Sequence, residues 1–258
     1  MFAVAYLTYF GVRAVTEGRT DRALTNAAAL LDAERWLGLA WEGAIQGTVA
    51  GSRVLQDIVN SIYIFGHWPV LIVAGVLLYR FRPRHYATLR DVCLMTGLLG
   101  LFIFALFPVA PPRLTSLPLM DTVTRGATAY RQILPPSLVN QYAAMPSFHA
   151  GWNLALGVVV FQASRHWALR AFAVVMPAAM AFSVVATANH FVIDVVVGVT
   201  LVTLALVAER ALRRRTARRA RAAATGRSAP AARSSAPRRA SCPAGERSRR
   251  GSPAADRR

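Results

Sequence analysis

The chain has 258 residues, 55% of them hydrophobic, and its mean hydropathy of +0.37 argues against a compact soluble domain. Its formal net charge of +18 is uneven, because residues 1–209 hold 14 arginines against 10 acids (+4) and residues 210–258 hold 16 against 2 (+14). The basicity is therefore mostly a property of the tail, which argues against a folded nucleic-acid-binding domain, and two cysteines are too few for a disulfide scaffold.

Six apolar segments predict membrane-spanning helices, because a hydrocarbon core about 30 Å thick needs about 20 mostly apolar helical residues. The first, residues 2–12, is short and lacks the basic start of a signal peptide, so we interpret it as a span clipped by the start codon. Residues 16–60 then alternate apolar with charged side chains, as around Glu34 and Trp36, and predict amphipathic helix at the membrane interface. The other five spans are expected at residues 62–79, 92–108, 148–163, 168–188 and 191–208.

The placement of arginines predicts which way these helices run. The link at residues 80–91 carries four arginines, Arg165 and Arg170 flank the link between the fourth and fifth spans, and the tail begins at Arg210. With alternating helices all three segments fall on one face, which the positive-inside rule makes cytoplasmic. We therefore expect a multi-pass protein of the cell inner (plasma) membrane, with residues 109–145 forming an outer loop.

The tail, residues 213–258, is composed mainly of Ala, Arg, Ser, Pro and Gly. Such a segment buries too little surface to offset its chain entropy, so we predict a disordered cytoplasmic tail after a membrane domain at residues 1–212. Its charge favours contact with anionic lipid headgroups rather than a specific nucleic acid. The alternative is an extension without a function of its own. The fold class predicted overall is all-α, a polytopic six-helix membrane bundle with this tail.

Ionisable residues inside membrane helices are costly and mostly functional. Here His149 stands at the start of the fourth span, and His190 and Asp194 stand at the start of the sixth. The i,i+4 spacing of His190 and Asp194 puts both side chains on one helical face. Asp194 can then accept a hydrogen bond from one imidazole nitrogen and leave the other free for substrate, the arrangement of an oriented nucleophile or base. The predicted topology brings both histidines to the outer face.

Two further features on this face suit an anion. A helix that begins at Pro146 would point Ser147 and nearby amides outward. Arg113, stiffened by two preceding prolines, would present a planar fork to a phosphate at the membrane edge. His67, about one turn into the second span, could approach the site, but we expect it to be a packed or interfacial residue. The stretch from Gly151 to Gly157 is expected to serve close helix packing.

These residues carry a resemblance to a known family. Pro146-Ser147-Phe148-His149 with a later His190-x-x-x-Asp194 resembles the second and third signature motifs of the type-2 phosphatidic acid phosphatase superfamily, which are six-helix membrane lipid phosphatases related to vanadium haloperoxidases. The wording Pro-Pro-Arg-Leu, Phe-His-Ala-Gly-Trp and Asn-His-Phe-x-x-Asp is more similar still to the inositol phosphorylceramide synthase branch. The resemblance covers about residues 20–212.

The resemblance implies a role for each residue. His190 would attack phosphorus to form a phosphohistidine, Asp194 would orient it, and His149 would protonate the leaving alkoxide and then deprotonate the acceptor. Arg113 and Ser147 would hold the phosphoryl oxygens. No metal and no cofactor is implied.

The chain also departs from the family's pattern. The first motif, a lysine seven residues before Arg-Pro, is missing, and Arg82-Pro83, which resembles half of it, is expected on the cytoplasmic face. The arginine that usually precedes the histidine of the third motif is Val184 here. We expect Arg113 to replace one missing cation, and Arg125 or Arg131 in the outer loop to replace the other.

The leading hypothesis is a metal-independent lipid phosphate phosphatase acting on a lipid phosphate or phospholipid at the outer leaflet. With a hydroxyl acceptor in place of water, the same intermediate would make it a lipid headgroup phosphotransferase, similar to inositolphosphotransferases. A second class is a metal-dependent membrane hydrolase with His149, His190 and Asp194 as zinc ligands. A third is a non-catalytic transporter or scaffold, in which the charges serve packing or proton relay.

Overall fold

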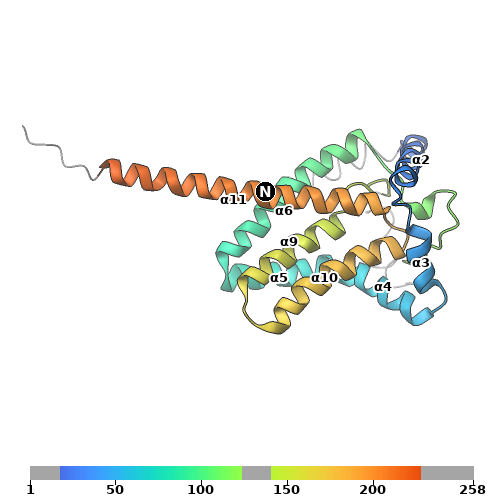
Figure 1. The fold of residues 1–258 in the computed structure, drawn as a ribbon, viewed down its shortest axis with the longest axis horizontal. Helices are drawn as coiled ribbons and strands as arrows, with labels where there is room; N and C mark the ends of the chain where they lie inside the picture. The colour runs from blue at the N-terminus through green and yellow to red at the C-terminus, as the bar shows by residue number, and fades with distance from the viewer. Residues whose placement is uncertain (1–17, 124–140, 228–258) are drawn as a thin grey trace, which may run out of the picture. The chain divides into compact units, whose positions relative to one another are not determined.

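The computed structural model describes residues 18–123 and 141–227, and most of them are helical (Figure 1). Apart from one isolated β-bridge between Val109 and Ala143, the regular elements of these residues are all helices, which confirms the all-α prediction for the described part of the chain. In chain order the elements are α2 (Thr20–Leu37), α3 (Glu42–Ala50), α4 (Arg53–Phe65), α5 (Trp68–Phe81), α6 (Pro83–Leu106), the 3₁₀ turn η1 (Pro112–Leu114), α9 (Phe148–Ala163), α10 (Trp167–Ala186) and α11 (Val192–Arg227).

Three helices are long and apolar enough to cross a membrane: α6, α10 and the part of α11 from Val192 to Ala220. The pair α4 and α5, bent by 46° where Gly66 and His67 separate them, would make a fourth span. Helix α9 is apolar but has 16 residues. The described residues therefore fit a membrane protein with three or four long spans, and the predicted six-helix bundle is not confirmed. The first predicted span, residues 2–12, lies outside the described residues.

Two predicted boundaries are wrong. The link expected at residues 80–91 shrinks to Arg82, because Pro83 occupies the first turn of α6, where a proline costs no hydrogen bond. The prediction ends the last span at residue 208 and starts the disordered tail at residue 213, whereas α11 is helical from Val192 to Arg227, so disorder is not confirmed for residues 213–227. The remainder of the predicted tail, residues 228–258, lies outside the described residues. By its contacts the chain divides into two units, Met1–Arg215 and Thr216–Arg258. The packing described in the next paragraphs is that of the first unit.

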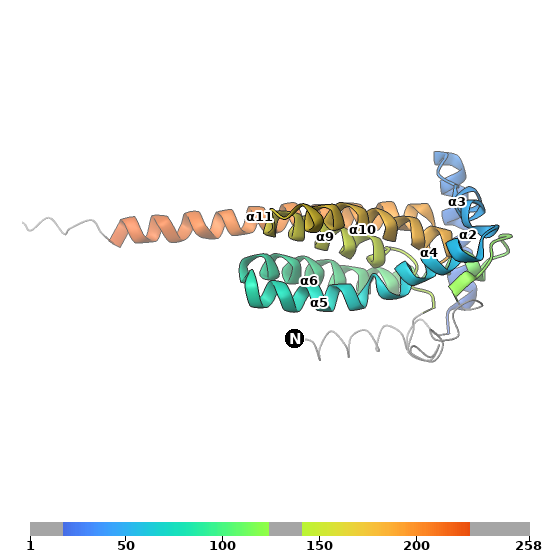
Figure 2. The ribbon, with the colours of Figure 1, turned by 90° about the horizontal axis from the view of Figure 1, so that it is seen from below.

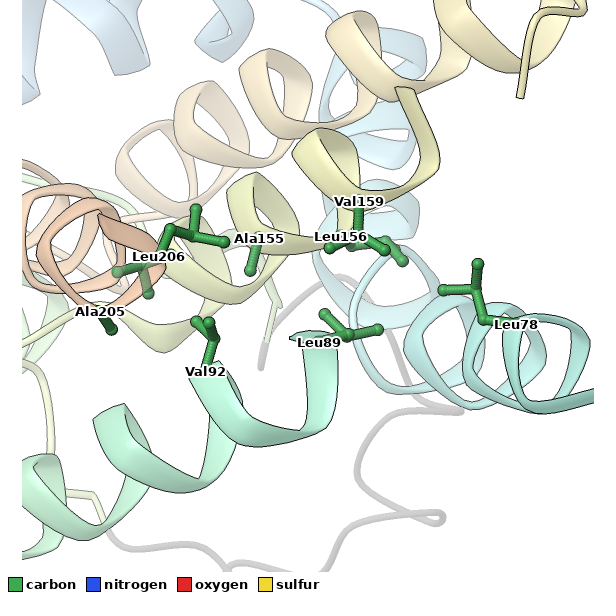
Figure 3. Close-up of a cluster of buried hydrophobic side chains, with 9 residues drawn as sticks. Leu78, Leu89, Val92, Ala155, Leu156, Val159, Ala205 and Leu206 are labelled. Atoms are coloured by element: carbon green, nitrogen blue, oxygen red, sulfur yellow. The ribbon is translucent and has the colours of Figure 1, made fainter. Parts of the chain in front are cut away.

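Helix α9 lies at the centre of this unit. It packs against α5, α6 and α10, and its residues Leu156 and Val159 meet side chains of α5, α6 and α11 in one apolar cluster (Figure 3). A helix that is apolar on all sides is typically buried among other helices. This explains why α9, with only 16 residues, is apolar throughout. The neighbours drawn around α9 are Leu78, Leu89, Val92, Ala205 and Leu206.

Glycines let α9 approach its neighbours at backbone distance. A Cβ on Gly198 of α11 would lie 2.3 Å from the carbonyl oxygen of Ser147, and one on Gly151 would lie 2.8 Å from the carbonyl oxygen of Gly198. A Cβ on Gly157 would lie 2.3 Å from the carbonyl oxygen of Ala173 in α10. The packing role predicted for Gly151 and Gly157 is confirmed, and the first turn of α9 is fixed directly against α11.

The two ends of this bundle differ. Helices α2 and α3 lie at the end where α9 and α11 begin (Figures 1 and 2). At the other end, Arg82 Nε donates to the carbonyl oxygen of Ala163, the last residue of α9, at 3.3 Å. The arginine-bearing links between helices thus gather at the end of α9 that is opposite to His149.

Candidate active site

His190 lies in a tight turn between α10 and α11 and is 5% exposed. Ala188 adopts a left-handed backbone with φ of 56°, a conformation that costs a non-glycine residue about 1–2 kcal/mol. Three successive backbone N–H groups hold the turn: Ala188 donates to the carbonyl oxygen of Val185 at 2.8 Å, and Asn189 and His190 donate to that of Val184 at 3.1 and 3.0 Å. The backbone of His190 is therefore fixed by the end of α10.

The tautomer of His190 follows from its neighbours. Its Nδ1 lies 2.8 Å from the carbonyl oxygen of Ala144 and 3.5 Å from Oδ2 of Asp194. A carbonyl oxygen accepts but cannot donate, so Nδ1 carries the proton and the neutral ring leaves Nε2 with its lone pair free. The sequence predicted Asp194 as the orienting partner. In the structure the nearer acceptor is the backbone of Ala144, which no side-chain pattern could have revealed.

His149 stands in the first turn of α9, as predicted, and faces His190 across the site. The ring centroids of the two histidines are 5.8 Å apart. The His149 ring also stacks on Tyr63 of α4, with centroids 4.6 Å apart. Two histidines that are 41 positions apart in the chain therefore meet at the end of the bundle, as the predicted topology required.

A third histidine joins them. His67, at the break between α4 and α5, is 3% exposed, and its ring centroid is 4.2 Å from that of His149. Asn153 bridges the two residues, since its Nδ2 lies 3.2 Å from His67 Nδ1 and donates to the carbonyl oxygen of His149 at 2.8 Å. The sequence predicted a packed or interfacial His67. It is packed, and it also approaches the site, the alternative that the sequence left open, because its ring lies against that of His149.

Arg113 lies in η1 and holds the turn that carries His190. Its backbone N–H donates to the carbonyl oxygen of Ala188 at 3.0 Å, and its guanidinium donates to Oδ1 of Asn189. The guanidinium Nε also lies 3.5 Å from Oδ2 of Asp121, and both side chains are about one-fifth exposed or less. The predicted phosphate-binding arginine is thus adjacent to His190, with part of its charge offset by a carboxylate.

Buried amides hold the segment that presents Asp121. Gln46 of α3 accepts from the N–H of Met120 at 2.7 Å and donates to the carbonyl oxygen of Met120 at 2.8 Å. Asn60 of α4 exchanges two hydrogen bonds with Thr122, at 2.8 and 3.0 Å. The sequence did not reveal Gln46 and Asn60, because polar residues in an amphipathic segment are normally expected on the face that contacts solvent.

Ser147 differs from its prediction in one respect. Helix α9 begins at Phe148 rather than Pro146, and Ser147 is its N-cap, with Oγ accepting from the N–H of Ala150 at 3.5 Å. The N–H of Ser147 donates to the carbonyl oxygen of Asp194 at 3.0 Å and is therefore used inside the protein. The hydroxyl hydrogen is the donor that Ser147 can still offer to a phosphate. The other predicted phosphate ligands, Arg125 and Arg131, lie outside the described residues.

Two sequence features fall where they take no part in this site. Arg82 binds the last residue of α9, and the 16 residues of that helix separate it from His149 by about 20 Å at 1.5 Å per residue. Val184, which stands where the family usually has an arginine, is fully buried and supplies its carbonyl to the His190 turn.

Carboxylates also gather behind His190. Asp194 Oδ2 accepts from the N–H of Phe191, and two glutamates from α2 and α3, Glu34 and Glu42, accept from the next N–H groups of α11. Both glutamates are buried, although they belong to the segment that the sequence predicts as amphipathic helix at the membrane interface. Within residues 18–123 and 141–227, no group of three or more His, Cys, Asp and Glu side chains is arranged to hold a metal ion.

Comparison with known proteins adds one finding. The sequence model described as the PAP2 superfamily matches residues 28–208, a range that contains all the residues of this site. No curated protein and no solved structure matches the chain.

Proposed function

Because the chain belongs to the PAP2 superfamily, we propose that it is an integral-membrane lipid phosphate phosphatase that works through a phosphohistidine on His190. The observation that carries the proposal is the hydrogen bond from His190 Nδ1 to the carbonyl oxygen of Ala144, which leaves Nε2 free beside His149. Apolar helices α6, α10 and α11, which are long enough to cross a membrane, fit a lipid substrate.

The first chemical step transfers the phosphoryl group to the enzyme. His190 Nε2 attacks phosphorus while the bond from phosphorus to the lipid oxygen breaks, and protonated His149 gives its proton to the leaving alkoxide. The ring of His190 gains positive charge as the N–P bond forms. The carbonyl of Ala144 at 2.8 Å and the carboxylate of Asp194 at 3.5 Å stabilise that charge.

The second step returns the enzyme to its starting state. Neutral His149 takes a proton from a water molecule, whose oxygen attacks phosphorus as the N–P bond breaks. The products are inorganic phosphate, a free His190 and a protonated His149. Arg113, and the hydroxyl of Ser147, hold the phosphoryl oxygens through both steps.

One observation favours a second candidate, transfer of a headgroup to a lipid or polyol hydroxyl. The ion pair with Asp121 offsets part of the charge that Arg113 offers. A phosphodiester carries one negative charge, whereas a phosphomonoester carries about −1.5 to −2 at neutral pH, so a weakened cation suits the diester better. The wording of the Arg113 and His149 motifs, which resembles inositol phosphorylceramide synthases, points the same way.

The orientation in the membrane belongs to the proposal as well. His149 and the arginine-bearing links lie at opposite ends of α9. If the arginine end is cytoplasmic by the positive-inside rule, the site opens to the outer leaflet of the plasma membrane. The exposed Trp36 and Trp41, at the turn between α2 and α3, fit a position at that interface.

The test is to incubate the purified protein with phosphatidate, a polyprenyl diphosphate and a phosphoinositide, and to score both free phosphate and new lipid products. Free phosphate from wild type, lost in His190→Ala, supports the phosphatase. Labelled headgroup that reaches an added hydroxyl acceptor without free phosphate selects the transferase. Equal turnover by wild type and His190→Ala contradicts both and returns the transporter or scaffold to consideration.

A further inference from the structure

The first turn of α11 is held by three carboxylates from three helices. The N–H groups of Phe191, Val192 and Ile193 donate to Asp194 Oδ2 at 2.8 Å, Glu42 Oε1 at 2.9 Å and Glu34 Oε1 at 2.7 Å. Asp194 belongs to α11 itself, whereas Glu42 comes from α3 and Glu34 from α2. Three successive backbone donors are therefore satisfied by side chains that are far apart in the chain.

The need for these carboxylates follows from the residue at the cap. The first N–H groups of a helix have no partner within the helix, and a buried donor without a partner destabilises the fold. Phe191, which precedes the helix, has no side-chain oxygen with which to cap it, and it is fully buried. Negative side chains also suit the positive end of the helix dipole. The two glutamates thus replace the missing cap.

Three buried negative charges at one point would repel one another. Asp194 and Glu34 are fully buried and Glu42 is 3% exposed, and in the described part of the chain no arginine forms an ion pair with either glutamate. Oε2 of Glu34 is buried without a donor from any described residue. A proton on that oxygen reduces the repulsion, because Glu34 then carries no charge and can donate to Glu42, with which it shares a hydrogen bond.

The electrostatic surroundings favour this proton. Burial raises the pKa of Glu34 to about 8, helped by the charges of Glu42 and Asp194 and by a hydrogen bond to Glu42, and opposed by the N–H of Ile193. The titratable groups that face Glu34 are thus Glu42 from α3 and Asp194 from α11, with His190 beyond Asp194. Glu34 therefore keeps its proton at neutral pH.

Glu34 and Glu42 are connected to His190 through Asp194 and the backbone. Asp194 Oδ2 binds the N–H of Phe191 and lies 3.5 Å from His190 Nδ1, and His190 directly precedes Phe191. We propose that Glu34 and Glu42, by sharing one proton, are positioning residues for His190: they fix the start of α11 and keep only one extra negative charge behind Asp194. This inference rests on the proposed function, in which His190 is the nucleophile.

Loss of the shared proton has a definite consequence. A second negative charge beside Asp194 repels the phosphoryl group and pushes the glutamates apart, which loosens the turn that holds His190. Activity of the wild type should therefore fall as the pH rises above about 8. A purely structural cap would lower stability in this range without giving the pH profile a limb that depends on Glu34.

The experiment compares Glu34→Gln and Glu34→Ala with wild type across pH 6 to 9.5, with kcat and KM measured separately for the lipid phosphate that the panel above shows to be turned over fastest. Glutamine keeps an oxygen for the N–H of Ile193 and an amide that donates to Glu42, so Glu34→Gln should keep kcat near neutral pH and lose the alkaline fall. Glu34→Ala should lower kcat by about tenfold or more, with KM little changed, because a small displacement of a reacting group is costly. Asp32→Asn, an exposed acid on the same helix that pairs with Arg35, is the matched control and should behave as wild type.

Two results overturn the inference: an alkaline limb in Glu34→Gln identical to that of wild type, or an unchanged kcat in Glu34→Ala. A wild type that turns over no lipid phosphate contradicts the proposed function instead. In that case infrared spectroscopy still decides the shared proton. A protonated-carboxyl band at neutral pH that is lost in Glu34→Gln supports it, and its absence from wild type refutes it.

Discussion

His190 Nδ1 lies 2.8 Å from the carbonyl oxygen of Ala144, a residue 46 positions earlier in the chain. This bond assigns the proton to Nδ1 through the backbone, which substitution of the Ala144 side chain cannot remove. Asp194, at 3.5 Å, adds negative charge and holds the N–H of Phe191. The orientation of the nucleophile is therefore shared between a carbonyl and a carboxylate.

Asp194→Asn tests this division. Asparagine keeps an oxygen for the N–H of Phe191, and Ala144 keeps the tautomer of His190, so we expect kcat to fall by about 10²-fold through loss of charge alone. Where a carboxylate alone sets the tautomer, the same change costs about 10⁴-fold. Steady-state phosphate release measures the difference. A loss of the larger size would show that Asp194, not Ala144, fixes the tautomer.

His190→Ala and His149→Ala should separate nucleophile from acid. Both should lower hydrolysis of a lipid phosphate, His190→Ala to background and His149→Ala by about 10²–10⁴-fold. A nitrophenyl phosphate has a leaving group that needs no proton, so His149→Ala should lose much less in the first-turnover release of nitrophenolate, although later turnovers still lack the base that activates water. His190→Ala should not recover in either phase. His166→Ala, on the link between α9 and α10, is the control. Equal losses on both substrates in the first turnover would argue against an acid at His149.

Arg113→Lys tests recognition of phosphate by a planar fork. Lysine keeps the charge but loses the geometry that binds Asn189 and Asp121, so we expect kcat/KM to fall by about tenfold, and Arg113→Ala by more. Arg35→Lys, on the exposed face of α2, serves as the control for arginine replacement. A wild-type kcat/KM in Arg113→Ala would remove Arg113 from the site.

Gly198→Ala tests the contact between α9 and α11. The new Cβ would lie 2.3 Å from the carbonyl oxygen of Ser147, and because that atom is backbone the helices must move apart. We expect a loss of stability of about 1–3 kcal/mol together with lower activity, since Ser147 and His149 shift with α9. Gly75→Ala in α5 meets nothing within 4 Å and should be neutral or stabilise by up to about 1 kcal/mol. Thermal unfolding in detergent and phosphate release are the measurements.

Glu34 should also make stability depend on pH. A pKa raised from 4.5 to about 8 on folding means that the folded state holds a proton that the unfolded state has lost. The free energy of unfolding should therefore fall as the pH rises from about 4.5 to about 8, by at most about 1.4 kcal/mol per pH unit, and level off above. Glu34→Gln should flatten that slope in thermal unfolding at pH 5 and pH 8. The same slope in both proteins would place the proton elsewhere.

Local patterns in the sequence determined much of this protein. The limits of α9 agree with the predicted fourth span, because the length of an apolar run is a property of neighbouring residues. Alternation of helices brought His149 and His190 to one end, and the i,i+4 spacing put Asp194 beside His190. The sequence also showed where the chain departs from the family's pattern. Val184 stands where the family usually has an arginine, and its apolar side chain cannot bind a phosphate.

Only the tertiary structure decided how the site is held. The carbonyl of Ala144 and the glutamates that cap α11 come from segments whose local sequence gives no sign of which residues they contact. Glu34 lies in an amphipathic pattern that predicts a solvated side chain, and it is buried because α2 covers the start of α11. The spacing of residues within one helix determines which side chains share a face of that helix. A hydrogen bond between residues that are distant in the chain depends instead on where packing places their two segments.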